Sequence, residues 1–313
     1  MANEPRTLIE AVRYFADPDV ALKHMIELRW PDGVYCPHCG RTDVRYIATR
    51  RIWECKEKHA KRQFSAKVGT IFEDSALPLD KWFVAIWQVA NCKNGISSYE
   101  MARALGITQK SAWHMNHRIR LAMKLGTIEK LSGHVEADES LIGGKAVNRH
   151  KGDPKRMHGG FAGKTAVIGA LERGGNAVAA VIVRTDTPTL DGFVHAVVEP
   201  GAKVSTDEHS GYRHLGRTFD HGFVRHGAGE YVVGSTHTNS IEGFWALLKR
   251  SIKGTYIAVE PFHLGRYIDE QVFRFNERKG TDGSRFASAL SGIVGRRLTY
   301  RELTRNVAIA SAA

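Results

Sequence analysis

Residues 165–184, TAVIGALERGGNAVAAVIVR, contain two apolar runs separated by Gly174 and Gly175. Short apolar runs that flank a glycine pair are typical of two strands joined as a β-hairpin. The surrounding sequence predicts further strands at 134–140, 203–206 and 223–225, and helices at 190–198 and 238–252. The second of these helices has an apolar face with Ile241, Trp245 and Leu248. Strands and helices in this order predict an α/β domain in which helices cover a mixed sheet.

Three acidic residues lie in or directly beside these predicted elements. Asp138 lies in the first strand, Asp207 directly follows the strand at 203–206, and Glu242 lies in the first turns of the long helix. A carboxylate buried beside a strand is costly unless it is paired or binds a metal. We therefore predict that the three carboxylates converge on two divalent cations, and oxygen ligands favour Mg²⁺ or Mn²⁺.

Other polar residues lie close to these acids in the sequence. Asn239 precedes Glu242 by about one helical turn, on the same face of the predicted helix. Lys249 follows Glu242 by about two turns on the same face, where its ammonium group would reach a phosphate. The remaining acids nearby are interpreted as solvated neighbours: Glu136, Glu139 and Glu208. Two cations suit phosphodiester chemistry, since one activates the attacking oxygen and the other stabilises the leaving oxygen.

Three of the four cysteines fall between positions 36 and 55. Cys36 and Cys39 form a Cys-x2-Cys knuckle, Cys55 follows 16 residues later, and His59 completes a Cys-x3-His pair. His38 is an alternative fourth ligand, although its place inside the knuckle disfavours it. Three thiolates and one imidazole suit tetrahedral Zn²⁺, and clustered cysteines without a secretion signal indicate metal binding rather than disulfides.

Residues 97–121 carry the signals of two helices joined by a glycine turn. Residues 97–100, SSYE, form a capping-box pattern, Gly106 ends the first helix, and Thr108 caps the second. This layout is a helix-turn-helix, whose second helix could contact the major groove of DNA. A solvated basic face on an ordinary helical pair is the alternative. The basic face of the second helix consists of Lys110, His114, His117, Arg118 and Arg120.

Composition narrows the class of protein further. The chain of 313 residues has a net charge of +12 and a pI near 9.6, which favours a polyanionic partner such as DNA. Hydrophobic residues make up 42%, enough for a folded core. No apolar run approaches the roughly 18 residues of a membrane span, and the first residues lack a signal-peptide layout. We expect a cytoplasmic protein with no membrane partner.

We expect five consecutive segments. A turn at residues 30–33, WPDG, separates an N-terminal helical segment from the cysteine unit. The predicted segments are the helical segment at 1–33, a zinc ribbon at 34–75, a helix-turn-helix region at 76–128, the catalytic domain at 129–285 and a C-terminal tail at 286–313.

Several blocks occur in a fixed order along nearly the whole chain. They are residues 30–40, WPDGVYCPHCG; 63–72, QFSAKVGTIF; 135–145, VEADESLIGGK; 236–250, THTNSIEGFWALLKR; and 267–278, YIDEQVFRFNER. Together they resemble the zinc-ribbon DDE-type transposases of bacterial insertion sequences. The resemblance implies a ribonuclease-H-like catalytic domain, cleavage at the ends of the element and transfer of the 3′-hydroxyl into target DNA.

The chain departs from this family at one point and leaves a second one open. The family usually closes its ribbon with Cys-x2-Cys, where this chain has Cys55 and His59. The third catalytic residue of such enzymes can be Asn, His or Glu, so Asn239 stays beside Glu242 as a candidate.

The expected function is therefore that of a DNA transposase, which acts on terminal repeats and target DNA. Holding two DNA ends together favours a homo-oligomer on DNA. The alternatives are a non-catalytic DNA-binding regulator, an inactive copy of the element, or a nuclease that cuts without joining.

Overall fold

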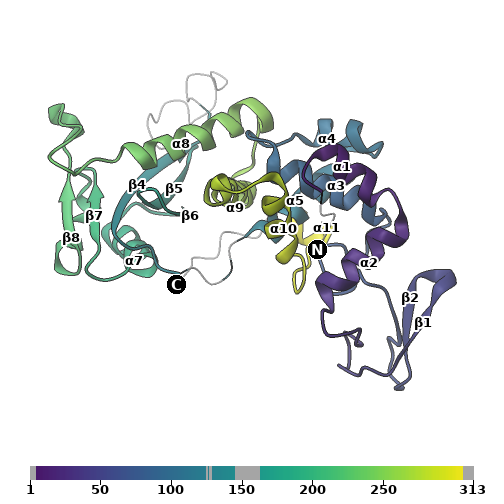
Figure 1. The fold of residues 1–313 in the computed structure, drawn as a ribbon. Helices are drawn as coiled ribbons and strands as arrows, with labels where there is room; N and C mark the ends of the chain where they lie inside the picture. The colour runs from purple at the N-terminus through teal and green to yellow at the C-terminus, as the bar shows by residue number, and fades with distance from the viewer. Residues whose placement is uncertain (1–4, 125, 127–128, 145–162, 306–313) are drawn as a thin grey trace. The chain divides into compact units, whose positions relative to one another are not determined.

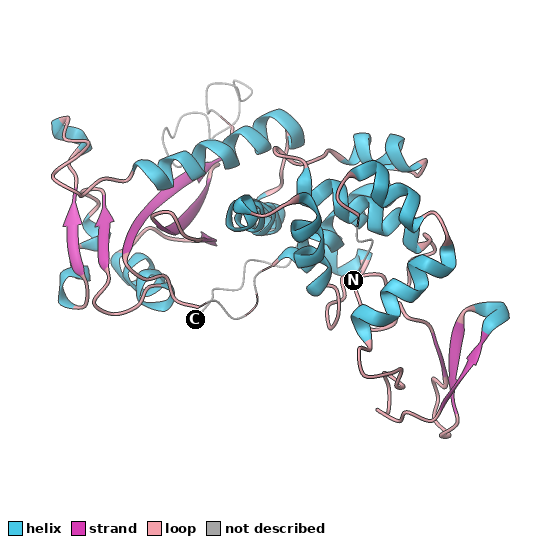
Figure 2. Cartoon of the chain, viewed as in Figure 1, coloured by secondary structure: helices cyan, strands magenta, loops and turns pink. Residues whose placement is uncertain are grey.

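Strand β4 (His134–Ile142) is the centre of a five-stranded sheet with the order β6-β5-β4-β7-β8. Strands β5 (Thr165–Glu172) and β6 (Ala177–Ile182) form the predicted hairpin, and the pairings within β4-β5-β6 are antiparallel. Strands β7 (Lys203–Thr206) and β8 (Asp220–Phe223) run parallel to β4. This mixed sheet confirms the expected ribonuclease-H-like fold (Figure 2).

Helices cover both faces of the sheet, as Figure 1 shows. Helix α7 (Thr187–Val197) packs on one face, while α8 (Asn239–Ser251) and α9 (Leu264–Asn276) pack on the other. Successive residues of β5 point into different cores: Ile168 belongs to the core beneath α7, and Val167 to the core beneath α8 and α9. Because successive side chains of a strand point to opposite faces, the two cores bury the central strands on both sides.

The computed structural model describes residues 5–124, 126, 129–144 and 163–305. Lys145, at the end of the block at 135–145, and residues 306–313 of the predicted tail lie outside the described residues. Contacts divide the chain into two compact units. Met1–Lys124 and Lys279–Arg305 form one, and Leu125–Arg278 lies in the other.

We predicted that the catalytic domain ends at 285 and that a C-terminal tail begins at 286. The division instead places residues 279–305 in the N-terminal unit. Helix α10 (Asp282–Ser291) packs on helix α3 (Leu79–Asn91) of the N-terminal unit. The ring of Phe286 lies 5.2 Å from Trp87 between centroids, inside a cluster of buried aromatic side chains. Burial of this apolar surface therefore attaches residues 279–305 to the N-terminal unit.

The N-terminal unit is mainly helical. The predicted helix pair is confirmed. Ser97 and Glu100 form the capping box, and Gly106 ends the first helix with φ +60°, a left-handed conformation that glycine adopts freely. The two helices of this pair are α4 (Ser98–Leu105) and α5 (Gln109–Met123). Beside them and α3 and α10, the unit contains α1 (Leu8–Phe15), α2 (Pro18–Arg29) and α11 (Tyr300–Thr304).

The cysteine unit folds as a small antiparallel sheet of β1 (Val44–Ile47), β2 (Ile52–Cys55) and β3 (Gln63–Phe64). Trp53 and Phe64 stack across β2 and β3 with ring centroids 6.1 Å apart. Short 3₁₀ and π turns connect the elements: η1 (Ala48–Arg50), η3 (Ser210–Tyr212), η4 (Leu215–Arg217), η5 (His226–Ala228), η6 (Ile252–Tyr256), η7 (Pro261–His263) and η8 (Glu277–Lys279). Among the described residues, no helix has the length and apolar character needed to cross a bilayer.

Candidate functional site

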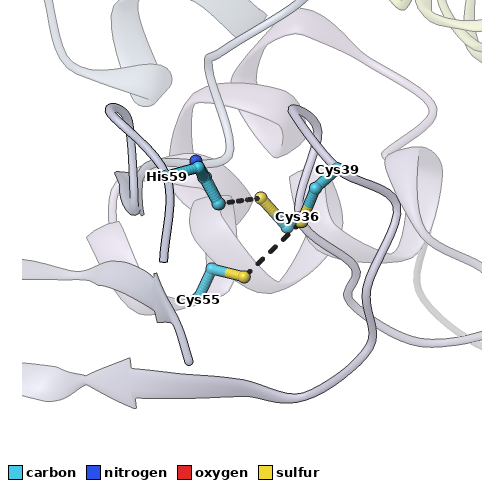
Figure 3. Close-up of side chains that lie close together, drawn as sticks. All are labelled: Cys36, Cys39, Cys55 and His59. Carbon is cyan, nitrogen blue, oxygen red and sulfur yellow. Dashed lines mark hydrogen bonds between the residues drawn. The ribbon is translucent and has the colours of Figure 1, made fainter. Parts of the chain in front are cut away.

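The cysteine unit brings four possible metal ligands together. One ligand atom from each of Cys36, Cys39, Cys55 and His59 lies within 4.8 Å of the others. The Sγ atom of Cys36 is 3.5 Å from Nε2 of His59, and the Sγ atoms of Cys39 and Cys55 are 3.6 Å apart (Figure 3). His38, the alternative fourth ligand, is not part of this group.

The spacing of these atoms fits a tetrahedral zinc site. Zn–S bonds of 2.3 Å in a tetrahedron imply S–S separations of about 3.8 Å, close to the distance between Cys39 and Cys55. Burial raises the pKa of the Cys36 thiol, but hydrogen bonds from the backbone of His38 and Cys39, together with those of the Cys39 and Cys55 side chains, outweigh this effect and lower the pKa. A lowered pKa favours the thiolate, which is the form that binds metal.

A second group of possible metal ligands lies on the central strands of the five-stranded sheet. Asp207 follows the last residue of β7, and Asp138 lies two residues beyond the point where β4 stops pairing with β7. Because β4 and β7 are parallel, both aspartates reach the same end of the sheet. One ligand atom from each of Asp138, Glu139 and Asp207 lies within 4.8 Å of the others.

Like charges and burial make this group electrostatically costly. Burial, followed by the charges of Asp207 and Glu139, raises the pKa of Asp138 to about 7. Burial also raises the pKa of Glu139, although its hydrogen bond of 2.7 Å from the Tyr212 hydroxyl works against this. A divalent cation would relieve the repulsion, and an all-oxygen donor set suits Mg²⁺ or Mn²⁺.

Both groups of possible ligands lie in regions that match the domains of known families. Residues 130–276 match the ISXO2-like transposase domain, and residues 17–60 match the transposase zinc-ribbon domain. The chain belongs to the zinc-ribbon transposases of insertion sequences. An uncharacterised protein of the transposable element ISH50 from Halobacterium salinarum is 26% identical to it over 253 residues, which is 76% of this chain and 84% of the relative.

Membership in this family supports zinc in the ribbon of the transposase, where Cys36, Cys39, Cys55 and His59 lie together. It also implies DNA as the partner and a nuclease or strand-transfer chemistry for the carboxylate-bearing domain. The predicted transposase is thus confirmed at the level of the family.

Helix α8 carries the remaining predicted site residues of the transposase. Glu242 has a side chain that is 52% exposed, and its carboxylate accepts a hydrogen bond of 3.2 Å from the Thr238 hydroxyl. Asn239 is exposed and Lys249 is half-buried on the same helix. Among the described residues, the group of carboxylates with atoms within 4.8 Å of one another contains Glu139 rather than Glu242.

Glu136 was interpreted as a solvated neighbour, and that interpretation is wrong. Its side chain is fully buried, and its carboxylate accepts hydrogen bonds from Arg173 Nε at 2.6 Å and from the backbone N–H groups of Ser240 and Ile241 at 2.7 and 3.0 Å. The period of two in a strand places Glu136 on the same face of β4 as Asp138. That alternation, in a strand buried on both faces, was the signal for its burial.

Glu139 was also interpreted as solvated, and it instead joins the carboxylate group of the transposase. It lies on the opposite face of β4 from Asp138. Beyond Glu136, however, β4 no longer pairs with β7, and both side chains approach Asp207 there. Glu208, the third such acid, is exposed as expected.

The basic face of α5 is largely internal. Arg118 is only 5% exposed, donates a hydrogen bond to the carbonyl of Glu73, and has a pKa lowered by burial to about 10. A ring nitrogen of His114 lies 3.1 Å from the carbonyl oxygen of Leu298. His117 and Arg120 are buried as well, so the alternative of a solvated basic face does not describe this helix. Lys110, by contrast, is exposed.

Proposed function

We propose that this transposase cuts DNA at the ends of its insertion sequence and joins the freed 3′-hydroxyl to target DNA, with two divalent cations at the carboxylate group. The observation that carries the proposal is the convergence of Asp138, in the middle of β4, and Asp207, directly after the adjacent parallel strand β7, inside the matched transposase domain. Phosphodiester exchange needs two oxygens to be stabilised at once, and paired cations meet that need.

Each residue of the site has a separate role in this proposal. Asp138 and Asp207 would hold the cations, and Glu242 would supply the third ligand from the first turn of α8, with Asn239 as its rival. Bound Mg²⁺ or Mn²⁺ would lower the pKa of the attacking water or hydroxyl and stabilise the leaving oxygen. Lys249 lies two turns further along α8 and would contact a phosphate of the bound DNA.

The remaining parts of the chain would recognise DNA. We assign end binding to the zinc ribbon, proposed at 34–75, and to the helix-turn-helix region, proposed at 76–128. Catalysis would belong to the domain proposed at 129–285. Because two DNA ends must be held together before they are joined, we propose that the transposase acts as a homo-oligomer on DNA.

The test compares the full-length wild type with Asp207→Asn on duplexes that carry the terminal sequences of the element, in Mg²⁺. We expect cleaved and joined products from the wild type, and a loss of both by more than about 100-fold in the variant, since even outer-shell partners of a metal cost about 10- to 100-fold. The exposed Asp220→Asn is the matched control. Binding of the ends should be unchanged in both variants.

Three outcomes would contradict the proposal. Full activity of Asp207→Asn would remove the carboxylate from the chemistry. End binding by the wild type without cleavage in Mg²⁺ or Mn²⁺ would favour a DNA-binding regulator or an inactive copy. Cleavage without joined products would indicate a nuclease.

A further inference from the structure

We propose that Trp245 is a positioning residue for Asp138, whose indole N–H fixes the orientation of the carboxylate toward Asp207. The inference rests on the proposed function and adds a residue that the sequence had placed only on the apolar face of a helix.

The hydrogen bond joins residues far apart in the chain. Nε1 of Trp245 donates to Oδ2 of Asp138 at 3.0 Å, and Trp245 is only 3% exposed. A buried indole N–H needs a partner, and an indole nitrogen can donate but not accept. The bond therefore holds one oxygen of the carboxylate and leaves its other lone pairs available to a cation.

Gly169 on β5 provides the space for this contact. It pairs with Asp138 across the β4–β5 ladder, so both face the same side of the sheet. A Cβ atom at Gly169 would lie 2.8 Å from Cη2 and 2.9 Å from Cζ2 of Trp245, and 3.3 Å from Cδ1 of Ile241. Real Cβ atoms do not approach so closely, and Cζ2 belongs to the ring edge next to Nε1. A side chain at position 169 would thus displace the edge that carries the N–H.

Glycine in the interior of a strand weakens the strand, and it often marks a place where another group must approach closely. The backbone of Gly169 lies outside the left-handed region, so alanine could adopt its conformation. The requirement for glycine at this position is therefore one of space. The Trp245 ring lies directly over the backbone of β5 and reaches the carboxylate on the neighbouring strand.

Trp245 also connects the two sources of ligands in the proposed site. Glu242 lies three residues before Trp245 on α8, about one helical turn away. A shift of α8 that moves Glu242 would therefore also move the donor that orients Asp138. Groups that hold a metal ligand from behind typically change metal affinity or activity by about 10- to 100-fold when they are removed.

The test uses the full-length protein and three variants. Trp245→Phe keeps an aromatic ring and removes the N–H, Gly169→Ala displaces the ring edge, and the double variant combines them. Phe244→Leu is the control for packing, because Phe244 is equally buried beside Trp245 in the same core. We measure Mn²⁺ binding by electron paramagnetic resonance without DNA, the Mg²⁺ concentration for half-maximal cleavage, and the melting temperature.

We expect Trp245→Phe and Gly169→Ala each to weaken Mn²⁺ binding about 10- to 100-fold and to raise the half-maximal Mg²⁺ concentration in parallel. Phe244→Leu should lower the melting temperature without changing Mn²⁺ affinity. In the double variant the smaller phenyl ring leaves room for the alanine, so the melting temperature should recover relative to Gly169→Ala. Mn²⁺ affinity should not recover, because the N–H is absent.

Wild-type Mn²⁺ affinity in Trp245→Phe would overturn the inference and leave the proposed function intact. Equal losses of Mn²⁺ affinity in Phe244→Leu and Trp245→Phe would also overturn it, since packing alone would then explain both. If the wild type binds no Mn²⁺, or if Asp138→Asn does not reduce the binding, the proposed metal site itself fails. The inference then fails with it.

Discussion

The carboxylate of Glu136 accepts a hydrogen bond of 2.7 Å from the backbone N–H of Ser240, at the start of α8. The first N–H groups of a helix have no partner within the helix, and the N-terminus attracts negative charge. Glu136 meets both needs from inside the sheet, and the Arg173 guanidinium compensates its charge at 2.6 Å. The end of α8 that carries Asn239 and Glu242 is thereby attached to the strand that carries Asp138.

Glu136→Ala should destabilise the catalytic unit by about 3 kcal/mol, because it removes the carboxylate that compensates the Arg173 charge and accepts from Arg173 Nε and two helix N–H groups. The loss of stability should appear first in α8, whose N-terminus loses its acceptor. The measurement is therefore hydrogen–deuterium exchange of residues 239–251. We expect faster exchange there than in the exposed control Glu230→Gln. Unchanged protection of α8 would show that other contacts hold the helix.

His59→Ala should lower zinc affinity by more than the roughly 10- to 100-fold that an outer-shell partner costs, because it removes one of four ligands. Zinc content of the purified protein, with and without a competing chelator, is the measurement. His38→Ala is the matched control and should retain zinc, since His38 is not part of the ligand group. The reverse result would move the fourth ligand to His38.

Asp138→Asn should stabilise the protein at pH 8 in magnesium-free buffer. An unfolded aspartate titrates near pH 4, whereas burial and the charges of Asp207 and Glu139 raise the folded pKa of Asp138 to about 7. The folded state therefore holds an extra proton between these values, and wild-type stability falls as the pH rises from about 4 to 7.

The gain for Asp138→Asn at pH 8 should be about 2–4 kcal/mol, from about 1.4 kcal/mol per pKa unit, and should shrink toward pH 4. Melting temperatures at pH 5 and pH 8 measure it, with Asp220→Asn as the exposed control. Added Mg²⁺ should stabilise the wild type more than the variant. An equal gain in stability at pH 5 and pH 8 would show that the gain does not come from the titration of Asp138.

Glu242→Gln should reduce DNA cleavage more than Asn239→Ala, because a carboxylate contributes charge to a cation and an amide does not. We expect a loss beyond about 100-fold for Glu242→Gln, measured as single-turnover cleavage in Mg²⁺ and again in Mn²⁺. A larger loss for Asn239→Ala would assign the third ligand to Asn239. Equal, small losses for both would favour Glu139 as the third carboxylate.

Lys110→Ala and Arg118→Ala should have different effects, although both residues lie on α5. Lys110 is exposed, so its removal should weaken DNA binding and reduce the salt dependence by about one counterion. Arg118 is buried with its guanidinium 5.4 Å from the centroid of the Trp82 ring, so its removal should lower the melting temperature. DNA affinity across a salt series and thermal unfolding separate the two. A stable Arg118→Ala protein with weakened DNA binding would restore Arg118 to the DNA-contacting face.

The sequence predicted the features of this transposase that depend on neighbouring residues. The hairpin around Gly174 and Gly175, the capping box at Ser97 and the Cys-x2-Cys knuckle are all set within a few positions. Local patterns also found the strand that carries Asp138 and the strand that Asp207 follows. The last strand was misplaced, at 223–225 instead of Asp220–Phe223, because its few half-exposed residues show no clear alternation.

Only the tertiary structure decided the features that join distant parts of the chain. The hydrogen bond from Trp245 to Asp138 spans 107 positions, and the bonds from α8 to Glu136 span 104 and 105. Periodicity placed Trp245 on an apolar face and could have indicated that Glu136 is buried. It does not tell which polar group lies opposite either side chain. The local pattern therefore determined which side chains are available, and the packing of α8 on the sheet determined which of them meet Asp138.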